Sequence, residues 1–398
     1  MRDERSAAGS RRADYGTRML LTGVRVVACE TGLAGPLCTR LLADLGADVV
    51  KVEQPGRGDV TRGWDTIARG LSSGFVWVNR GKRSVALDVK DAAARPALER
   101  LVAGSDVFLQ NLTPGWAERV RLDEPTVRTL RPDVVYTDIS GYGRDGPYAS
   151  RTAYDLVVQG EAGLLSVTGT PAAPARVGVS VCDLAAGAYA AAATAAALVR
   201  RAETGEGAHV AVSLFDVMVD WLGYYPHLWW HRRETPERTG LRHPLFCPYG
   251  PYRAGDGRLF SVAVLSREHW RTFCADVLAR SELADDPRFA TNEARVEQRD
   301  ELEPQLEAVF SERPAEEWIA RLDAARIPCG RVNDVAAVME HPQLAHNELV
   351  AEVDSPAGRI PTVGSPFLVG GARRPAGAVP RLGEHTEEVL GEPLRERR

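Results

Sequence analysis

Two aspartates occupy positions where a carboxylate could do chemistry. Asp183 follows the segment RVGVSVC and precedes an alanine-rich segment of helical composition, and Asp155 opens the apolar segment LVVQ. An aspartate before a helix usually caps it, because the carboxylate accepts backbone N–H groups and interacts favourably with the helix dipole. A carboxylate can also attack an activated acyl group, and attack on a thioester gives a mixed anhydride and a free thiolate. The residues alone leave both interpretations open.

The nucleophile interpretation needs backbone N–H groups that hold the oxyanion formed during acyl transfer. Glycine lets the backbone approach a substrate closely, and the loops before Asp183 contain Gly141, Gly143, Gly146, Gly163 and Gly169. Two acids at the ends of secondary-structure elements could also face one cleft at a sheet edge, where α/β proteins bind ligands.

Strand and helix patterns alternate along the first half of the chain. Apolar runs predict strands at 24–29, 49–53, 84–89, 107–110 and 134–139, and amphipathic runs predict helices at 35–45, 93–103 and 114–121. Pro114 stands at the start of the last helix, where its missing N–H costs nothing. The alternation predicts an α/β fold in which a parallel, doubly wound sheet carries helices on both faces.

The pattern changes after about residue 205. We predict strands at 209–213 and 259–264, an aromatic-rich helix at 214–230, helices at 269–278, 299–310 and 315–325, and short strands from about 350. A smaller α+β unit is expected in this part of the chain. Residues 1–18 are polar and arginine-rich, so we expect a disordered tail, with the folded part beginning at Met19.

Composition argues against several classes of protein. The formal net charge is −5, with 49 basic and 54 acidic residues, which disfavours a dedicated nucleic-acid binder. The six cysteines are scattered without a C-x-x-C pair, so we expect reduced thiols in a cytoplasmic protein and no zinc site. The alanine-rich run 184–199 is shorter than the roughly 20 residues that span a bilayer. We expect it to pack closely against another helix and not to enter a membrane.

Familiar nucleotide and hydrolase motifs are missing. The turn after the first predicted strand reads ETGLAGP and lacks the G-x-G-x-x-G pattern of dinucleotide-binding folds. Glu53 stands where such folds place a ribose-binding acid, but without the glycine turn this is weak evidence. The chain also lacks a P-loop and a G-x-S-x-G nucleophile elbow.

A series of blocks, in order from about Leu21 to Leu390, resembles the family III CoA-transferases. This group includes formyl-CoA, carnitine and short dicarboxylate CoA-transferases together with α-methylacyl-CoA racemase. The blocks include LTGVRVVACETGLAGPLCTRLLADLGADVVKVEQPGRGD, NRGKRSVALDVK, AYDLVVQGEAGLLSVTG, VCDLAAGAYAAAA and RIPCGRVND. Any one block is a weak signal, whereas together they are specific.

The resemblance implies an α/β fold with a large Rossmann-like domain, a smaller α+β domain and an interlocked homodimer. It assigns residues 19–225 to the first part of the large, CoA-binding domain, 226–335 to a linker and the small domain, and 336–398 to a return linker and the last part of the large domain. The implied partners are a second copy of the chain and small-molecule substrates, with no nucleic acid and no membrane.

The resemblance also implies the chemistry. The family's catalytic aspartate matches Asp183, which would pass CoA from an acyl-CoA donor such as succinyl-CoA to a small acid through aspartyl anhydride and aspartyl-CoA thioester intermediates. One thioester replaces another, so the reaction needs neither ATP nor a metal. No cofactor would be bound permanently, because the CoA thioesters are substrates.

Further positions match the family's contacts with CoA. They are Leu33, Ala34, Leu87, Asp88, Val89, Lys90, Asn111, Leu112, Thr113, Arg119, Arg151 and Tyr154. Arg119 would offer a planar fork to a phosphate, although a solvated helix face would explain it as well. Gln54 departs from the arginine that transferases often have near the adenine, and Lys51 or Arg57 could supply that charge.

Two departures from the family distinguish its branches. Racemase members have Gly-His-Asp where this chain has Ala153-Tyr154-Asp155, and a tyrosine, with an ordinary pKa of about 10, is a poor base near neutral pH. The glycine-run loop of formyl-CoA transferase is also missing, which disfavours oxalate–formate exchange. We therefore expect a dicarboxylate CoA-transferase, with Arg242 and His243 as candidate cations for the second carboxylate. A racemase and a non-catalytic acyl-CoA-binding relative remain the alternatives.

Overall fold

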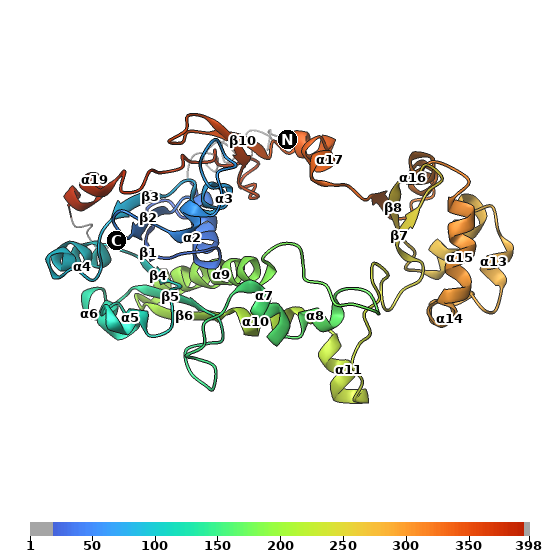
Figure 1. Ribbon diagram of the computed structural model, residues 1–398, viewed down its shortest axis with the longest axis horizontal. Helices are drawn as coiled ribbons and strands as arrows, with labels where there is room; N and C mark the ends of the chain where they lie inside the picture. The colour runs from blue at the N-terminus through green and yellow to red at the C-terminus, as the bar shows by residue number, and fades with distance from the viewer. Residues whose placement is uncertain (1–18, 394–398) are drawn as a thin grey trace, which may run out of the picture. The chain divides into compact units, whose positions relative to one another are not determined.

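The computed structural model describes residues 19–393, which form two units (Figure 1). Within the described range, the first unit contains residues 19–164, 177–226 and 343–393, and the second contains 165–176 and 227–342. The second unit thus includes the segment 165–176, which the sequence analysis assigned to the large domain. The predicted tail, 1–18, lies outside the described residues.

A six-stranded parallel sheet forms the centre of the first unit. Its strands are β1 (Arg25–Cys29), β2 (Asp48–Glu53), β3 (Arg83–Ala86), β4 (Val107–Gln110), β5 (Val135–Ser140) and β6 (Ala208–Ser213). They lie in the order β3-β2-β1-β4-β5-β6, and every neighbouring pair is parallel. The predicted α/β class and parallel sheet are confirmed. The order reverses between β1 and β4, and ligands of doubly wound sheets bind beyond the carboxyl ends of the strands at such a point.

Helices cover both faces of this sheet because its strands are apolar on both sides. Val26 and Ala28 of β1 belong to the core under α2 (Ala34–Asp44) and α9 (Val181–Thr204). Val27 and Cys29, the alternate residues, belong to the core under α4 (Arg95–Ala103). The other helical segments of the unit are η1 (Val60–Gly63), α3 (Ser73–Asn79), η2 (Ala92–Ala94), α5 (Trp116–Arg119), α6 (Glu124–Leu130), α7 (Asp155–Glu161), α10 (Leu214–Trp221) and α19 (Thr386–Gly391).

Helix α9 is the alanine-rich segment, and it packs closely on α2 as expected. A Cβ added at Gly187 would lie 2.7 Å from the backbone oxygen of Ala34 and 3.2 Å from Cβ of Leu37, so only glycine permits this approach. By length and composition alone, α9 is the one helix among residues 19–393 that could cross a membrane. Half of the residues in its most apolar window are buried inside the protein, which is typical of a core helix.

Two predicted helices differ from the structure. The predicted helix 214–230 is two helices, α10 and α11 (Tyr225–Arg232), because Gly223 takes a positive φ of 62° between them. The predicted helix 114–121 is only α5, and it begins at Trp116, after Gly115 has taken a φ of 71°. Pro114 therefore does not occupy the first helical position.

After the second unit, the chain returns to the first unit, and its last described residues lie beside the six-stranded sheet. The hairpin of β10 (Val350–Val353) and β11 (Ile360–Val363) is followed by α19. Glu392, just after α19, accepts hydrogen bonds from Arg25 of β1 and Arg83 of β3. These ion pairs fix the last described turn of the chain to the two strands.

The second unit has its own small sheet and aromatic core. Strands β7 (Tyr249–Arg253), β8 (Leu259–Ala263) and β9 (Cys329–Arg331) form an antiparallel sheet in that order. The core contains Phe260, Phe310, Trp270 and Trp318. The helices are α12 (Arg267–Thr272), a π-helical turn (Phe273–Val277), α13 (Glu282–Asp285), α14 (Asn292–Glu297), α15 (Arg299–Phe310), α16 (Ala315–Ala324) and α17 (Val335–Met339), while α8 (Leu164–Val167) and α18 (Pro342–His346) lie at the unit boundaries.

Candidate active site

Asp183 lies in the first turn of α9. The helix begins at Val181, and Ser180 occupies the N-cap position, so the interpretation of Asp183 as the cap residue is wrong. The positive end of the helix dipole still acts on a carboxylate in the first turn. Among residues 19–393, no group donates a hydrogen bond or forms an ion pair to the Asp183 carboxylate. This carboxylate is half-buried and has no hydrogen-bond or ion-pair partner among these residues, so it is available to a substrate.

Asp155, on α7, performs the capping that the sequence suggested for Asp183. Its Oδ1 accepts a hydrogen bond of 2.9 Å from the backbone N–H of Cys182, in the first turn of α9. Its Oδ2 accepts a hydrogen bond of 2.6 Å from Nε2 of Gln159, one turn further along α7. Oε1 of Gln159 in turn accepts a hydrogen bond of 2.9 Å from the N–H of Val177. Asp155 therefore satisfies one free donor at the start of α9 and fixes the chain that leads to it.

Burial raises the pKa of Asp183 to about 7, and the negative charge of Asp155 adds to the rise. Both causes act against the ionised form, which has little water around it and a like charge nearby. A carboxylate with this pKa is more basic than a free aspartate, so it is a stronger nucleophile and is still ionised in a large fraction near neutral pH. The site is thus suited to attack on an acyl group.

The pH dependence of turnover follows from the raised pKa of Asp183. Only the ionised carboxylate attacks, so kcat/KM should fall about tenfold per pH unit as the pH drops below roughly 7. We expect an acid limb in the profile of kcat/KM, measured with a CoA ester and an acid whose own ionisation is complete over the range. A profile that stays flat down to about pH 5 would contradict the assignment of Asp183 as nucleophile.

The substitution Asp155→Asn tests the second cause of that shift. It removes the like charge near Asp183 but leaves an oxygen that can accept from Cys182 N–H. We expect the acid limb of the kcat/KM profile to move to lower pH, because Asp183 then ionises more easily. The same measurement on Gln159→Glu, which adds a negative charge beside Asp155, should move the limb the other way. A limb that is unchanged in both variants would show that another group controls it.

Ala34 and Leu33, two predicted CoA contacts, lie near the same helix. Gly187, whose contact with the Ala34 backbone is described above, stands four residues after Asp183 and therefore on the same face of α9. Leu33 is the N-cap residue of α2, and no side chain caps that helix. The turn between β1 and α2 thus offers backbone groups on the side of α9 that carries Asp183.

Asn111, another predicted contact, follows β4 and fastens this turn. Its Oδ1 accepts from Thr31 N at 2.9 Å, and its Nδ2 donates to Thr31 O at 2.8 Å. A Cβ at Gly35 would lie 2.7 Å from the Asn111 side chain, so these segments approach closely. Loop polarity does not account for Asn111, because its amide joins the carboxyl ends of β1 and β4 at the reversal of the sheet.

The segment Leu87–Lys90 follows β3 at the same edge of the sheet. Leu87 is buried, and its N–H donates to Glu53 O on β2 at 2.9 Å. A hydrogen bond from Gln54 and one from the backbone N–H of Lys90 hold the pKa of Asp88 below its usual range. Gln54, which replaces the family's frequent arginine, therefore binds Asp88.

The remaining predicted contacts lie in the segments that follow β4 and β5, with Arg119 at the end of α5. Leu112 donates its N–H to the side chain of Gln110, and Thr113 is exposed. Arg119 is exposed, with Nη1 3.2 Å from Pro114 O. The Arg151 guanidinium lies 3.7 Å from the centre of the Tyr148 ring, and Tyr154 is 82% exposed. Apart from Leu112, these side chains are open to a ligand.

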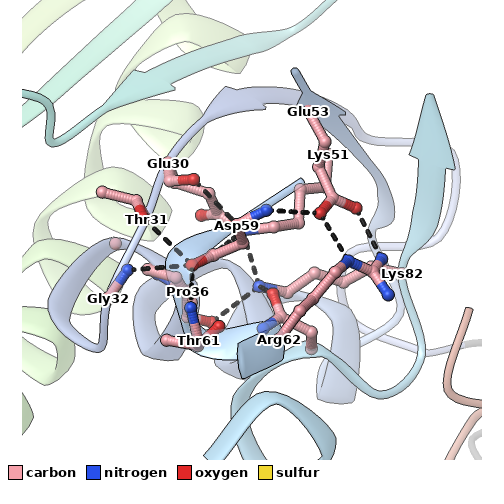
Figure 2. A network of polar contacts seen from close by, with 12 residues as sticks. Glu30, Thr31, Gly32, Pro36, Lys51, Glu53, Asp59, Thr61, Arg62 and Lys82 are labelled. Carbon is pink, nitrogen blue, oxygen red and sulfur yellow. Dashed lines mark hydrogen bonds and ion pairs between the residues drawn. The ribbon is translucent and has the colours of Figure 1, made fainter. Parts of the chain in front are cut away.

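Two charged side chains of β2 are bonded inside the protein, which excludes one of the two candidates for the missing arginine. Lys51 has no exposed surface, and its Nζ lies 2.7 Å from Asp59 Oδ2, so it cannot replace the arginine missing at position 54. Glu53 accepts from Arg62 and Ser84 and is not a free ribose-binding acid. Both belong to a buried polar network at the carboxyl ends of β1 and β2 (Figure 2). The polar residue types gave no sign of this burial.

The candidate cations of the second unit are also engaged. Arg242 Nε lies 2.6 Å from Glu303 Oε2, whose side chain is buried. The His243 ring stacks on Tyr249, and its Nδ1 accepts the N–H of Leu245 at 3.1 Å. The Arg242 guanidinium is thus already ion-paired, and the His243 ring is already hydrogen-bonded, without a substrate carboxylate. Among residues 19–393, no cluster of three or more His, Cys, Asp or Glu side chains could hold a metal ion.

Comparison with known proteins identifies the family of the chain. The family model described as CoA-transferase family III matches residues 21–386. The human succinyl-CoA:glutarate CoA-transferase is 34% identical over 97% of this chain and 89% of its own length. The acetyl-CoA:oxalate CoA-transferase of Acetobacter aceti is 34% identical over 88% and 89%. A crystal structure of a CaiB/BaiF family protein from Brucella suis superimposes with a TM-score of 0.82 at 34% identity, covering 94% of this chain and 99% of that one.

The family match and these relatives define the class of the protein as a CoA-transferring enzyme. The chain belongs to CoA-transferase family III, and it is a CoA-transferase. The resemblance found in the sequence is confirmed, and so is the enzyme class. The substrates of such an enzyme are CoA thioesters and carboxylic acids.

Proposed function

We propose that this enzyme moves CoA from an acyl-CoA donor such as succinyl-CoA to a small dicarboxylic acid, with Asp183 as the covalent nucleophile. The observation that carries the proposal is the unengaged, half-buried Asp183 carboxylate in the first turn of α9, with a pKa raised to about 7. The relatives named for glutarate and for oxalate support a dicarboxylate acceptor.

The proposed reaction has four steps. An Asp183 oxygen attacks the thioester carbon of the donor, the C–S bond breaks, and a mixed anhydride and CoA thiolate form. The thiolate attacks Cγ of Asp183, and the donor acid leaves as a carboxylate from the aspartyl-CoA thioester. The acceptor carboxylate attacks Cγ and displaces the thiolate, and the thiolate finally attacks the acceptor acyl carbon and releases the Asp183 carboxylate. Overall, one CoA thioester replaces another, so no external energy source is needed.

We place the CoA along the carboxyl edge of the sheet, at the predicted contacts. The backbone of Leu33 and Ala34, the loop Leu87–Lys90 and the loop after Asn111 follow three different strands at this edge. The open guanidiniums of Arg119 and Arg151 are suited to phosphate oxygens, since a planar fork can donate two hydrogen bonds.

We also propose that the enzyme is a homodimer located in the cytoplasm. The outer side of α9 exposes Tyr189 and Val199, and Val219 and Trp221 of α10 are exposed as well. The Tyr189 hydroxyl donates to Asp220 at 2.6 Å and accepts from Trp221 Nε1, which holds these rings in an ordered surface. Exposed apolar side chains on neighbouring helices are typical of a protein interface.

The proposal is tested with purified enzyme, succinyl-CoA and a panel of acids that includes glutarate, oxalate and monocarboxylates of the same lengths. We expect new CoA esters of dicarboxylates, released together with succinate in equal amounts. Transfer to monocarboxylates alone would overturn the acceptor assignment. Deuterium incorporation into a 2-methylacyl-CoA without CoA transfer would instead indicate a racemase, and tight CoA binding with neither reaction would indicate a non-catalytic relative.

A further inference from the structure

A buried network of charges lies behind the turn that connects β1 to α2 (Figure 2). It contains three carboxylates and three cations: Glu30, Glu53, Asp59, Lys51, Arg62 and Lys82. The side chains of Lys51, Lys82, Glu30 and Asp59 have no exposed surface. Burying charges is costly unless each is paired and hydrogen-bonded, and each of these charges is paired within the network.

Asp59 is the member that contacts the turn. Its Oδ1 accepts from the hydroxyl of Thr31 at 3.0 Å and from the N–H of Gly32 at 3.4 Å. The same oxygen accepts the N–H of Thr61 at 2.9 Å, and Oδ2 accepts from Lys51 Nζ at 2.7 Å. Figure 2 shows Thr31 and Gly32 pointing toward Asp59 from the turn.

Lys51 fixes the direction of Asp59. Its Nζ is also 3.2 Å from Glu30 O and 3.4 Å from Glu30 Oε1, so it ties Asp59 to the last residue before the turn. Although burial opposes its charge, Glu30 and Asp59 raise the pKa of Lys51 above its ordinary value. The ammonium therefore stays charged, and it holds Asp59 Oδ2 while Oδ1 faces the turn.

Lys82 anchors the other side of Glu30 to α2. Its Nζ lies 2.7 Å from Glu30 Oε1, and it donates to Pro36 O in the first turn of α2 at 2.9 Å. With Asn111 holding both backbone groups of Thr31, the turn is fixed from the β4 side and from the β2 side. Leu33 and Ala34, at the end of this turn, therefore have one defined position.

We propose that Asp59 is a positioning residue for CoA binding, which sets the β1–α2 turn so that Leu33 and Ala34 present their backbone to the cofactor portion of the substrate. This inference rests on the proposed CoA site. Asp59 touches no substrate. It acts through Thr31 and Gly32, with Lys51 keeping its carboxylate in place.

The substitution Asp59→Asn tests this role. It turns an NH2 group toward the Lys51 ammonium or toward the Thr31 and Gly32 donors, so one set of contacts must break. We expect KM for the acyl-CoA, and the Kd for free CoA, to rise by roughly tenfold or more, with kcat at saturation reduced much less. Hydrogen–deuterium exchange should increase in the peptide that contains residues 30–36.

Glu53→Gln is the matched control. It removes a charge from the same network. Glu53 Oε2 accepts the backbone N–H of Asp59 at 2.9 Å, and the amide oxygen of glutamine can still accept it, so the side-chain contacts of Asp59 with the turn stay in place. We expect KM and Kd to change by less than about twofold, whatever the loss in thermal stability. Thr31→Val removes one contact with Asp59 without touching a buried charge. It should raise the Kd for CoA even if Asp59→Asn does not fold.

The binding and activity measurements distinguish failure of the positioning role of Asp59 from failure of the proposed CoA-transfer function. If Thr31→Val and Asp59→Asn leave the Kd for CoA unchanged, or if Glu53→Gln raises it equally, Asp59 has only a structural role and the inference is wrong. If the wild type binds CoA, the variants weaken that binding as expected, and no acid receives CoA, then the positioning role stands and the proposed function fails.

Discussion

Replacing Asp183 by asparagine is expected to reduce CoA transfer by roughly 10⁴-fold or more, because the amide cannot form the anhydride that starts the proposed reaction. The variant keeps the size and shape of the side chain. Asp183 has no hydrogen bond to lose among residues 19–393, so little of the fold depends on it. Initial rates with succinyl-CoA and the best acceptor, measured for the variant and the wild type, give the ratio directly.

The thermal stability of Asp183→Asn distinguishes the loss of the nucleophile from a loss of folding. The folded-state pKa of Asp183 is raised above its unfolded value, so the ionised side chain opposes folding as the pH rises from about 4 through 7. At pH 8 the asparagine variant should therefore unfold at the same temperature as the wild type or higher. Asp216→Asn, which changes an exposed aspartate in the first turn of α10, is the matched control and should keep wild-type activity. Full transferase activity in Asp183→Asn would contradict the mechanism.

The substitution Gly187→Ala is expected to have the largest effect on stability. The added Cβ would lie 2.7 Å from the backbone oxygen of Ala34, which cannot move without shifting the start of α2. Alanine gains about 1 kcal/mol of helix propensity over glycine, but overpacking typically costs about 1–3 kcal/mol and also displaces the β1–α2 turn. We expect a lower unfolding temperature and a higher KM for the acyl-CoA, measured by thermal unfolding and steady-state kinetics.

Gly391→Ala provides the control for this experiment. Gly391 also lies in a helix, α19, and no atom lies within 4 Å of a Cβ added there. Alanine should raise the unfolding temperature slightly and leave the kinetics unchanged. If Gly187→Ala behaves like Gly391→Ala, then α9 and α2 are not packed at this glycine as described.

Much of the fold could be predicted because local patterns specify it. The five strands expected in the first half occur within a few residues of their predicted bounds, and the alanine-rich run is a core helix. The prediction of one long helix after residue 214 is wrong. The apolar periodicity continues across Gly223, but the positive φ of this glycine ends the helix. Gly223 itself indicates the end of a helix, but the prediction gave more weight to the apolar periodicity.

The site could be predicted only in part, because its details depend on contacts between distant residues. Asp183 is not the cap residue of α9, because the N–H of Cys182 at the start of this helix is accepted by Asp155, 27 residues earlier. The burial of Lys51 beside Asp59 has no signature in residue type or spacing. The hydrogen bonds of the Asn111 amide to Thr31, 80 residues away, could not be predicted from the sequence either.

Trapping of the covalent intermediate on Asp183 is the most direct test of the proposed mechanism. The enzyme is incubated with succinyl-CoA without acceptor, treated with hydroxylamine or borohydride, digested and examined by mass spectrometry. We expect a hydroxamate, or the reduced alcohol, on the peptide that contains Asp183, only when the donor is present and not in Asp183→Asn. An unmodified Asp183 in an enzyme that still transfers CoA, or modification at another carboxylate, would contradict the proposed mechanism.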